Sequence, residues 1–430
     1  MTWHKTLHQQ YLEAYMSYMA LRMALLPPES APQLLEQVKT DCLILYNIFT
    51  ARYLNTRVLV PKRGNFSLAW DYASDPALHD RFVTMFRVSP HVFEAVLHLI
   101  RNHVVFKNNS NNEQTDPRDQ LAVTLYRMGR FGNGASVRDV ARDAGISEGA
   151  VHDFTERTLT AIMSLHDQFV RPLTDEEKEI EKCWIEEQLG VAGSTWREGY
   201  IMYDGTIIVF YGRPGMDGAA YYTRKQNYGF NAQIGNAPSN LRIVDYCVGL
   251  TGSAHDSTAF KHTAAGRWPD WMFKGKEFAW ADSAYDVDHH TIAVHKKPEA
   301  DEPRNRLFDR VVSGLRVRSE HCMGALKGRW QSLRGLRVPI NNASDHHRAS
   351  RWVSCCIIMH NAVIDIDGWL GVIEFAPLHT RKDEHDDSGD NDEPIEPFDE
   401  DFDENDPEAR RKELVQEIND IKAAFPHLRL

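Results

Sequence analysis

The pattern of apolar residues changes near Gly199, and this change most limits what the chain can fold into. Before it, apolar residues recur at helical spacing, as in Phe93, Val96, Leu97 and Ile100. After it come short β-rich runs separated by Gly, Pro and Asn, at 200–203, 207–211, 230–234, 241–250, 277–281 and 291–295. Long helices are predicted at 303–333 and 345–366. Strands followed by helices predict an α/β domain over 195–370, with a mixed central sheet flanked by helices.

The chain before this domain is predicted to be all-helical. Residues 1–60 form one helical segment, interrupted at Pro27–Pro28, and residues 85–175 form a helical domain. Within that domain, residues 136–157 have the spacing of a helix-turn-helix, with Gly145 at the turn. The exposed face of the second helix carries more acidic than basic residues, whereas base-reading helices usually present Arg, Lys, Asn or Gln. A DNA-reading motif and a structural helical bundle both remain open.

Charge is unevenly distributed along the 430 residues, whose formal net charge is −12. Fifteen Asp and Glu residues and no Lys or Arg lie between Asp383 and Glu408. Without them, the 49 Lys and Arg outnumber the remaining 46 acidic residues. We therefore expect a mildly basic folded part, a disordered acidic linker at 381–408 and a C-terminal helix at 409–424. The linker either solvates the protein, competes with DNA for a basic surface, or binds a basic partner.

The compartment is suggested by what the sequence lacks. No apolar run reaches the roughly 20 residues needed to cross a bilayer, and Met1–Lys5 has no secretion signal pattern. The six cysteines include no Cys-x-x-Cys pair and suggest no disulfide framework. Reduced thiols in a cytosolic or nuclear protein, without membrane contact, fit this pattern best.

Two aspartates follow predicted strands directly. Asp204 comes after the run 200–203, and Asp282 comes after 278–281. A single aspartate of this kind is more often a turn residue, but two on neighbouring strands can share a divalent cation. Glu320 lies on a predicted helix among basic residues, where it would otherwise be read as a surface ion-pair residue. Carboxylates on two strands and one helix can position two hard cations for phosphodiester chemistry.

Six motifs between Met202 and Asn361 resemble, in order, those of the Harbinger (PIF-like) DDE transposases. The second motif has Thr223 and Gln226 where the family usually has Asn and Gly, and the fourth has Ala281 and Ala284 in place of two glycines. The six segments are MYDGTI at 202–207, YYTRKQNYGFNAQ at 221–233, GSAHDS at 252–257, ADSAY at 281–285, SEHCMGALKGRW at 319–330 and CCIIMHN at 355–361.

The resemblance implies an RNase H-like catalytic domain in which Asp204, Asp282 and Glu320 bind two Mg²⁺ or Mn²⁺ ions. Asp256 would be a further acidic metal-supporting position, and its alternative is a carboxylate at the start of a helix. The implied DNA contacts are Arg224, Lys225, Lys327 and Arg329, although Arg224 and Lys225 are equally well explained as solvated side chains. His360 and Asn361 are expected to be a buried, hydrogen-bonded pair.

The family implies a nuclear, metal-dependent endonuclease and transposase that cleaves transposon ends and joins them to target DNA. It also implies a separate Myb-like DNA-binding partner, and a homo-oligomer is compatible with it. One alternative is a domesticated nuclear protein that binds DNA or acts as a scaffold without transposition. Another is a nuclease that serves the host and belongs to no mobile element.

Overall fold

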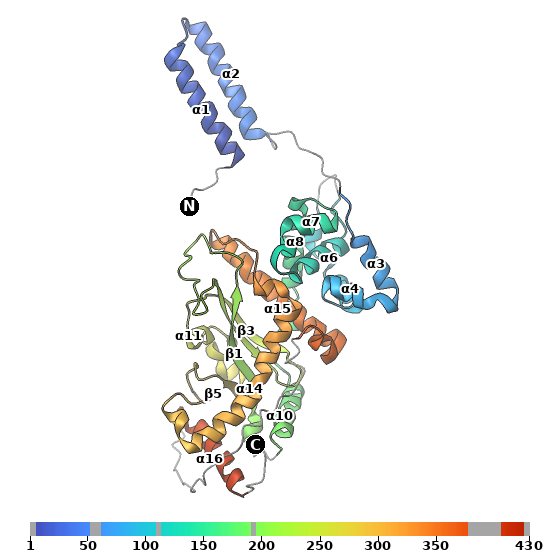
Figure 1. Ribbon diagram of the computed structural model, residues 1–430, viewed down its shortest axis with the longest axis vertical. Helices are drawn as coiled ribbons and strands as arrows, with labels where there is room; N and C mark the ends of the chain where they lie inside the picture. Colours follow the sequence, from blue (N-terminus) through green and yellow to red (C-terminus); the bar gives the residue numbers. More distant parts are fainter. Residues whose placement is uncertain (1–5, 52–61, 109–112, 191–194, 377–405, 425–430) are drawn as a thin grey trace. The chain divides into compact units, whose positions relative to one another are not determined.

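The structure is a computed structural model that describes residues 6–51, 62–108, 113–190, 195–376 and 406–424. The chain divides into two compact units, Met1–Pro61 and Lys62–Leu430. The first unit is a hairpin of α1 (Leu7–Leu25) and α2 (Ala31–Thr50), shown in Figure 1. Thr6 caps α1 through a capping box, and Ser30 caps α2 just after the Pro27–Pro28 break. None of the helices in these described ranges is both long enough and apolar enough to cross a membrane.

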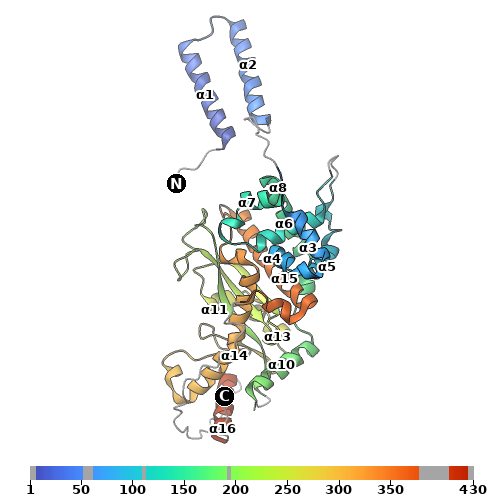
Figure 2. The same cartoon turned by 45° about the vertical axis from the view of Figure 1, so that its right-hand side comes forward.

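The second unit begins with helices, several of which pack around the long helix α15 (Ala343–Ile373). Among them, α5 and α8 contact α15 directly, and Figure 2 shows this group at one end of the sheet. Gly145, between α7 and α8, has a φ of +70°, which suits glycine. A DNA-reading role for this helix pair stays a prediction. The helices are α3 (Phe66–Ser74), α4 (His79–Phe86), α5 (Pro90–Ile100), α6 (Pro117–Met128), α7 (Val137–Ala144), α8 (Glu148–Met163), α9 (His166–Phe169) and α10 (Asp175–Leu189).

A five-stranded mixed sheet forms the centre of the unit, in the order β3-β2-β1-β4-β5. The first three strands along the chain pair antiparallel, whereas β4 pairs parallel with β1 and β5 pairs parallel with β4. The predicted mixed sheet flanked by helices is confirmed. The strands are β1 (Gly199–Val209), β2 (Gly229–Asn236), β3 (Ile243–Thr251), β4 (Phe278–Ala281) and β5 (Thr291–Ala293).

Alternation along β1 and β4 divides the apolar side chains between two faces of the sheet. Met202 and Trp280 pack with apolar residues of α14 (Pro303–Arg329). Tyr203 and Ala281 lie in a different cluster, with residues from α11 (Asp256–Phe260), α12 (Ala264–Arg267) and α13 (Pro269–Met272). The sheet is therefore covered on both faces, and α14 lies over the face that carries Met202.

The expected pair His360–Asn361 is buried and hydrogen-bonded, as predicted. The Nε2 atom of His360 lies 3.0 Å from the carbonyl oxygen of Leu241. Asn361 accepts a hydrogen bond from the backbone N–H of Ile243 and donates to the Ile243 carbonyl, at 3.0 and 2.7 Å. The side chain thus bonds to β3 as a neighbouring strand would, and it joins α15 to the sheet.

The C-terminal helix α16 (Ala409–Ala424) is part of the core rather than a detached element. Its buried residues Leu414, Val415 and Ile418 belong to the cluster that α14 forms with the sheet. Asn419 also donates a hydrogen bond of 2.9 Å to the carbonyl oxygen of Arg304. The linker expected at 381–408 lies outside the described ranges, apart from residues 406–408.

We predict that Leu414→Ala lowers the free energy of unfolding by about 2–5 kcal/mol, because it leaves a cavity under α14. Asp420→Ala, at an exposed position of the same helix, should change it by less than about 0.5 kcal/mol. Urea titration followed by circular dichroism measures both. Equal, small effects of the two substitutions would show that α16 does not contribute to the core.

Candidate functional site

The sheet places Asp204 and Asp282 beside each other. Met202 of β1 pairs with Trp280 of β4 in parallel register. Asp204 and Asp282 each lie two residues further on, so both side chains leave the same face as Met202 and Trp280. Asp282 follows the end of β4, as predicted. The prediction that Asp204 also ends a strand is wrong, because β1 continues to Val209 through pairing with β2, including Asp204 with Ile234.

Arg316, on α14, bridges the two aspartates. Its guanidinium lies 3.4 Å from Asp204 and 3.8 Å from Asp282. Burial raises the pKa of Asp204 to about 6, with smaller upward contributions from Asp282 and Asp256, while Arg316 opposes the shift. The three carboxylates therefore act on one another electrostatically, and Arg316 compensates part of that repulsion. Sequence reasoning missed Arg316, since its partners are distant along the chain.

Glu320 lies on the same stripe of α14 as Arg316, one turn further along. Lys327, seven residues beyond Glu320 on this stripe, reaches β1 by donating to Thr206 Oγ1 at 2.6 Å. Glu320 therefore lies on α14 between Arg316 and Lys327, which both contact β1. Its own side chain is exposed. Within the described ranges, no three His, Cys, Asp or Glu residues are grouped closely enough to hold one metal ion. Of the predicted triad, Asp204 and Asp282 lie beside each other, whereas Glu320 is not grouped with them.

Asp256 is the first residue of α11 and lies close to the backbone of β1. It accepts hydrogen bonds from Asn231 Nδ2 at 2.8 Å and from Gln233 Nε2 at 2.9 Å. A side chain at Gly205 would come within 2.5 Å of Asp256 Oδ1, so the close approach requires glycine next to Asp204. The first-turn position is observed, and the metal-supporting role of Asp256 stays a prediction.

Two buried amides on β2 orient Asp256. Asn231 and Gln233 alternate with apolar residues, which puts both on one face of the strand. Gln233 also donates to Asn231 Oδ1 at 2.8 Å and accepts a hydrogen bond from the buried hydroxyl of Tyr285. Sequence reasoning missed these residues, but two buried-strand amides at alternate positions are a usable signal, because such groups need partners.

Arg224 and Lys225 lie at the exposed tip of the turn 223–227. Hydrogen bonds between Thr223 and Asn227 close this turn, and Arg224 reaches to within 3.6 Å of Asp256. Gln226 has a φ of +60°, a left-handed conformation that favours glycine and accounts for the usual glycine at this position of the motif. By contrast, neither Ala281 nor Ala284 has a positive φ, so alanine is accommodated there.

Lys327 and Arg329 are buried rather than exposed. Besides Thr206, Lys327 bonds to the carbonyl oxygen of Ile207 at 2.8 Å, and burial lowers its pKa to about 8. Arg329, only 2% exposed, donates to the carbonyl oxygens of Arg87 and Gly371. These contacts tie α14 to β1, to the C-terminal end of α4 and to α15. The structure therefore gives both cations structural partners and does not support the expected DNA contact by this pair.

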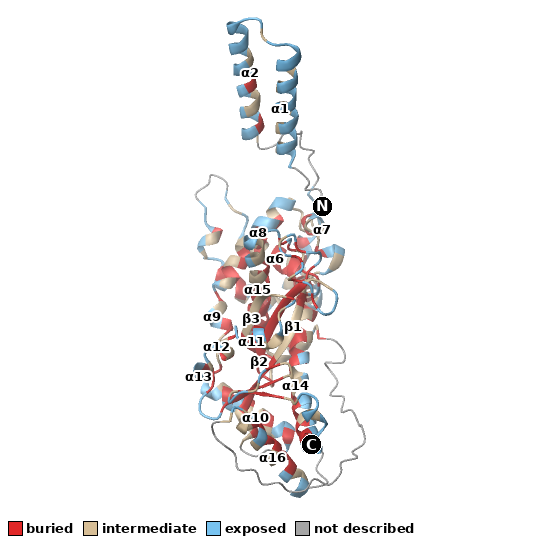
Figure 3. Cartoon of the chain, turned by 90° about the vertical axis from the view of Figure 1, so that its left-hand side faces the viewer, coloured by how far each residue is buried: buried red, intermediate tan, exposed pale blue. Residues whose placement is uncertain are grey.

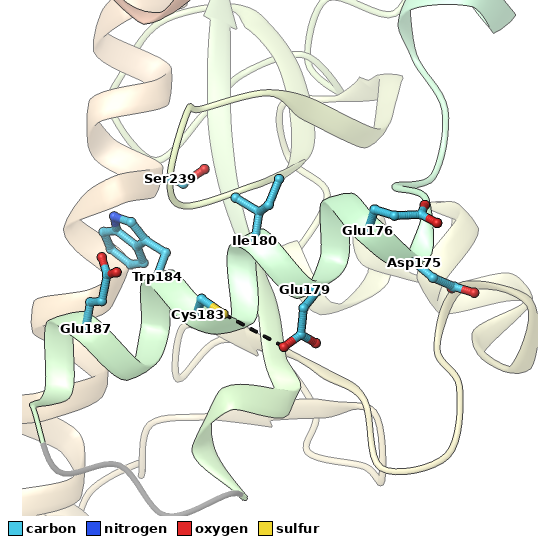
Figure 4. Close-up of a pocket in the computed structure, with 8 residues that line it drawn as sticks. All are labelled: Asp175, Glu176, Glu179, Ile180, Cys183, Trp184, Glu187 and Ser239. Carbon is cyan, nitrogen blue, oxygen red and sulfur yellow. Dashed lines mark hydrogen bonds between the residues drawn. The ribbon is translucent and has the colours of Figure 1, made fainter.

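A pocket of about 670 Å³ lies elsewhere, on α10. Figure 4 shows its acidic side chains and the apolar side chains of Ile180 and Trp184. None of the predicted site residues lines it. The pocket is lined by Asp175, Glu176, Glu179, Ile180, Cys183, Trp184, Glu187 and Ser239.

Comparison with known proteins supports the sequence resemblance. Residues 203–361 match the family model described as DDE superfamily endonuclease. The chain is also 22% identical over 310 residues to the Arabidopsis thaliana protein named "Protein ALP1-like", covering 66% of this chain and 71% of that protein. No solved structure matches the chain significantly. The ordered motifs and both matches agree, and residues 203–361 are similar to the DDE superfamily endonucleases of the Harbinger type.

Proposed function

We propose that this protein is a metal-dependent DNA endonuclease with an RNase H-like catalytic domain, and that Asp204, Asp282 and Glu320 are its catalytic carboxylates. The observation that carries the proposal is the shared face of Asp204 and Asp282, beneath the helix that carries Glu320. The sheet order, three antiparallel strands followed by two parallel ones, supports the RNase H-like assignment.

The donor set fits Mg²⁺ or Mn²⁺, which prefer carboxylate oxygens. In the structure, the guanidinium of Arg316 supplies the positive charge between Asp204 and Asp282. Its Nε atom is buried without a hydrogen-bond partner, so Arg316 is incompletely satisfied where it lies. Asp204, Asp282 and Glu320 would hold the metal once Arg316 has withdrawn. Two bound ions would supply activation of the attacking water or 3′-hydroxyl and charge neutralisation at the leaving oxygen.

The remaining polar residues have distinct tasks in this proposal. Asn231 and Gln233 orient Asp256 on the face of the sheet opposite Asp204, where its carboxylate lies against Gly205. Arg224 and Lys225 present exposed cations at the tip of the turn beside Asp256, where they can contact backbone phosphates of DNA. DNA would thus approach along the edge formed by this turn and the start of α11.

The biological reaction proposed is cleavage at transposon ends and strand transfer to target DNA in the nucleus. A separate Myb-like protein would supply sequence recognition, since the exposed face of α8 carries Glu148 and Asp153 rather than a set of basic residues. Terminal inverted repeats beside the gene would favour this transposase over a nuclease with a host role.

A second candidate is a domesticated descendant that binds DNA or acts as a scaffold without cutting. The specific observation in its favour is that Arg316 neutralises two carboxylates while Glu320 remains exposed. In that case the ion pairs with Arg316 would be the permanent state of the site. The two candidates differ in whether the carboxylates bind divalent cations.

The first prediction from the proposed function concerns cleavage. Asp204→Asn, Asp282→Asn and Glu320→Gln should each reduce nicking of supercoiled plasmid in Mn²⁺ by about 100-fold or more, because each removes a charge needed by the metal. The assay should use the full chain and a variant lacking only residues 381–405. Truncation near Thr380 would also remove α16, which packs in the core.

Asp270→Asn is the matched control, since Asp270 is an exposed carboxylate on α13, outside the candidate site. Nicking that persists in all three site variants would refute the assignment. Absence of nicking from folded wild-type protein, with and without a DNA-binding partner, would favour the scaffold candidate.

The second prediction concerns Arg316. Arg316→Gln should destabilise the metal-free protein by about 1–3 kcal/mol, since Asp204 and Asp282 lose their shared counter-charge. The same variant should be stabilised by Mg²⁺ more strongly than the wild type, because the cation no longer competes with the guanidinium. Thermal unfolding across a Mg²⁺ titration measures both effects without any cleavage assay.

Arg306→Gln is the control on the same helix, at an exposed position away from the aspartates. Should Mg²⁺ stabilise the wild type and Arg316→Gln equally, competition between Arg316 and metal would be disproved. Failure of Mg²⁺ to stabilise either protein would count against the metal site itself.

A further inference from the structure

The first unit buries very little of its own apolar surface. In its described part, residues 6–51, only Asp41 and Ile48 are buried. Figure 3 shows both helices mostly in the colour of exposed residues. A two-helix hairpin has too small an interior to be stable alone unless something else covers it. The helices therefore need a partner surface.

The contact between α1 and α2 follows a heptad pattern but has a polar centre. Asp41 accepts hydrogen bonds from Tyr15 at 2.8 Å and from Arg22 Nη1 at 3.0 Å. Such a buried ion pair fixes the register of the two helices and contributes little net stability. The less exposed positions that form this seam are His8, Leu12, Tyr15, Met19 and Arg22 on α1, and Gln37, Asp41, Ile44 and Ile48 on α2.

Each helix carries a second apolar stripe at heptad spacing, outside the seam. On α1 the stripe lies one residue before each seam position, and its leucines at 21 and 25 are 59% and 69% exposed. On α2 the stripe lies one residue after each seam position, and Phe49 is 68% exposed. The α1 stripe is Leu7, Tyr11, Ala14, Tyr18, Leu21 and Leu25, and the α2 stripe is Leu35, Val38, Cys42, the half-buried Leu45 and Phe49.

We propose that a second copy of this chain packs against these stripes, joining two hairpins into one helical assembly. Heptad-spaced apolar stripes are the pattern by which helices pack on helices of the same kind. A two-fold symmetric dimer brings the same stripes of both copies into one interface. Large aliphatic and aromatic side chains from two copies can bury on the order of the 1,200 Å² that the smaller stable interfaces need.

Charge favours a second copy over other occupants. Neither stripe contains a charged residue, and residues 6–51 carry only Arg22 and Lys39 against Glu13, Glu29, Glu36 and Asp41. A unit this poor in basic residues does not suit DNA, whose binding surfaces are rich in Lys and Arg. It also lacks the basic polar face of helices that lie on membranes. Two nearly neutral hairpins, however, repel each other very little.

The test is the mass of the full-length chain, measured by sedimentation equilibrium over a range of micromolar concentrations. We expect a dimer for the wild type. Leu21→Glu combined with Leu25→Glu should give monomers, as should Leu21→Lys combined with Leu25→Lys, because each places like charges against the partner's stripe. Helical content measured by circular dichroism shows whether the hairpin is still folded, and Glu and Lys both favour helix.

Mixing the Glu and Lys variants should restore the dimer, since opposite charges then meet across the interface. This rescue distinguishes a broken interface from an unfolded hairpin. Ser17→Glu combined with Ala24→Glu, at exposed positions outside both stripes, is the control and should remain dimeric. A wild type that is monomeric at every concentration would overturn the proposal, as would dimers in both stripe variants. Neither result depends on nuclease activity.

Discussion

The two pairings of β1 determine where Asp204 and Asp282 lie in the candidate site. Antiparallel pairing with β2 holds the backbone of Asp204 and places Asn231 and Gln233 on the opposite face of the sheet, where they bind Asp256. Parallel pairing with β4 aligns Asp282 with Asp204, and β4 then stops, which leaves both carboxylates facing α14 rather than another strand. A register shift of one residue in either pairing would turn a carboxylate to the opposite face and remove the site.

Once the carboxylates are placed together, their mutual repulsion must be compensated. Arg316 does this for Asp204 and Asp282, while Asn231, Gln233 and the more distant Arg224 compensate Asp256. Burial is the main cause of the raised pKa of Asp204, and the neighbouring carboxylates Asp282 and Asp256 add less to it. In the proposed function, a divalent cation would favour the charged form of Asp204.

The sequence predicts the layered fold and Asp282 because the apolar strand runs are short and clearly bounded. It misplaces the end of β1, since Asp204-Gly205 reads locally as a turn and only pairing with β2 keeps the strand going. Arg316 could not be found from local pattern, because its two partners belong to separate strands. The local sequence around Lys327 and Arg329 predicts surface cations. Their burial becomes visible only once α14 is packed in the fold.

In the proposed function, the difference between an active nuclease and an inactive descendant would depend on two side chains of α14. Arg316 contacts both aspartates, and Glu320 lies one turn further along the same stripe with its side chain exposed. For Glu320 to replace the guanidinium between the aspartates, both side chains would have to move, while α14 itself is held by Lys327, Arg329 and the apolar contacts of α16. The fold provides a fixed frame, and the charge placed between Asp204 and Asp282 decides which state the site adopts.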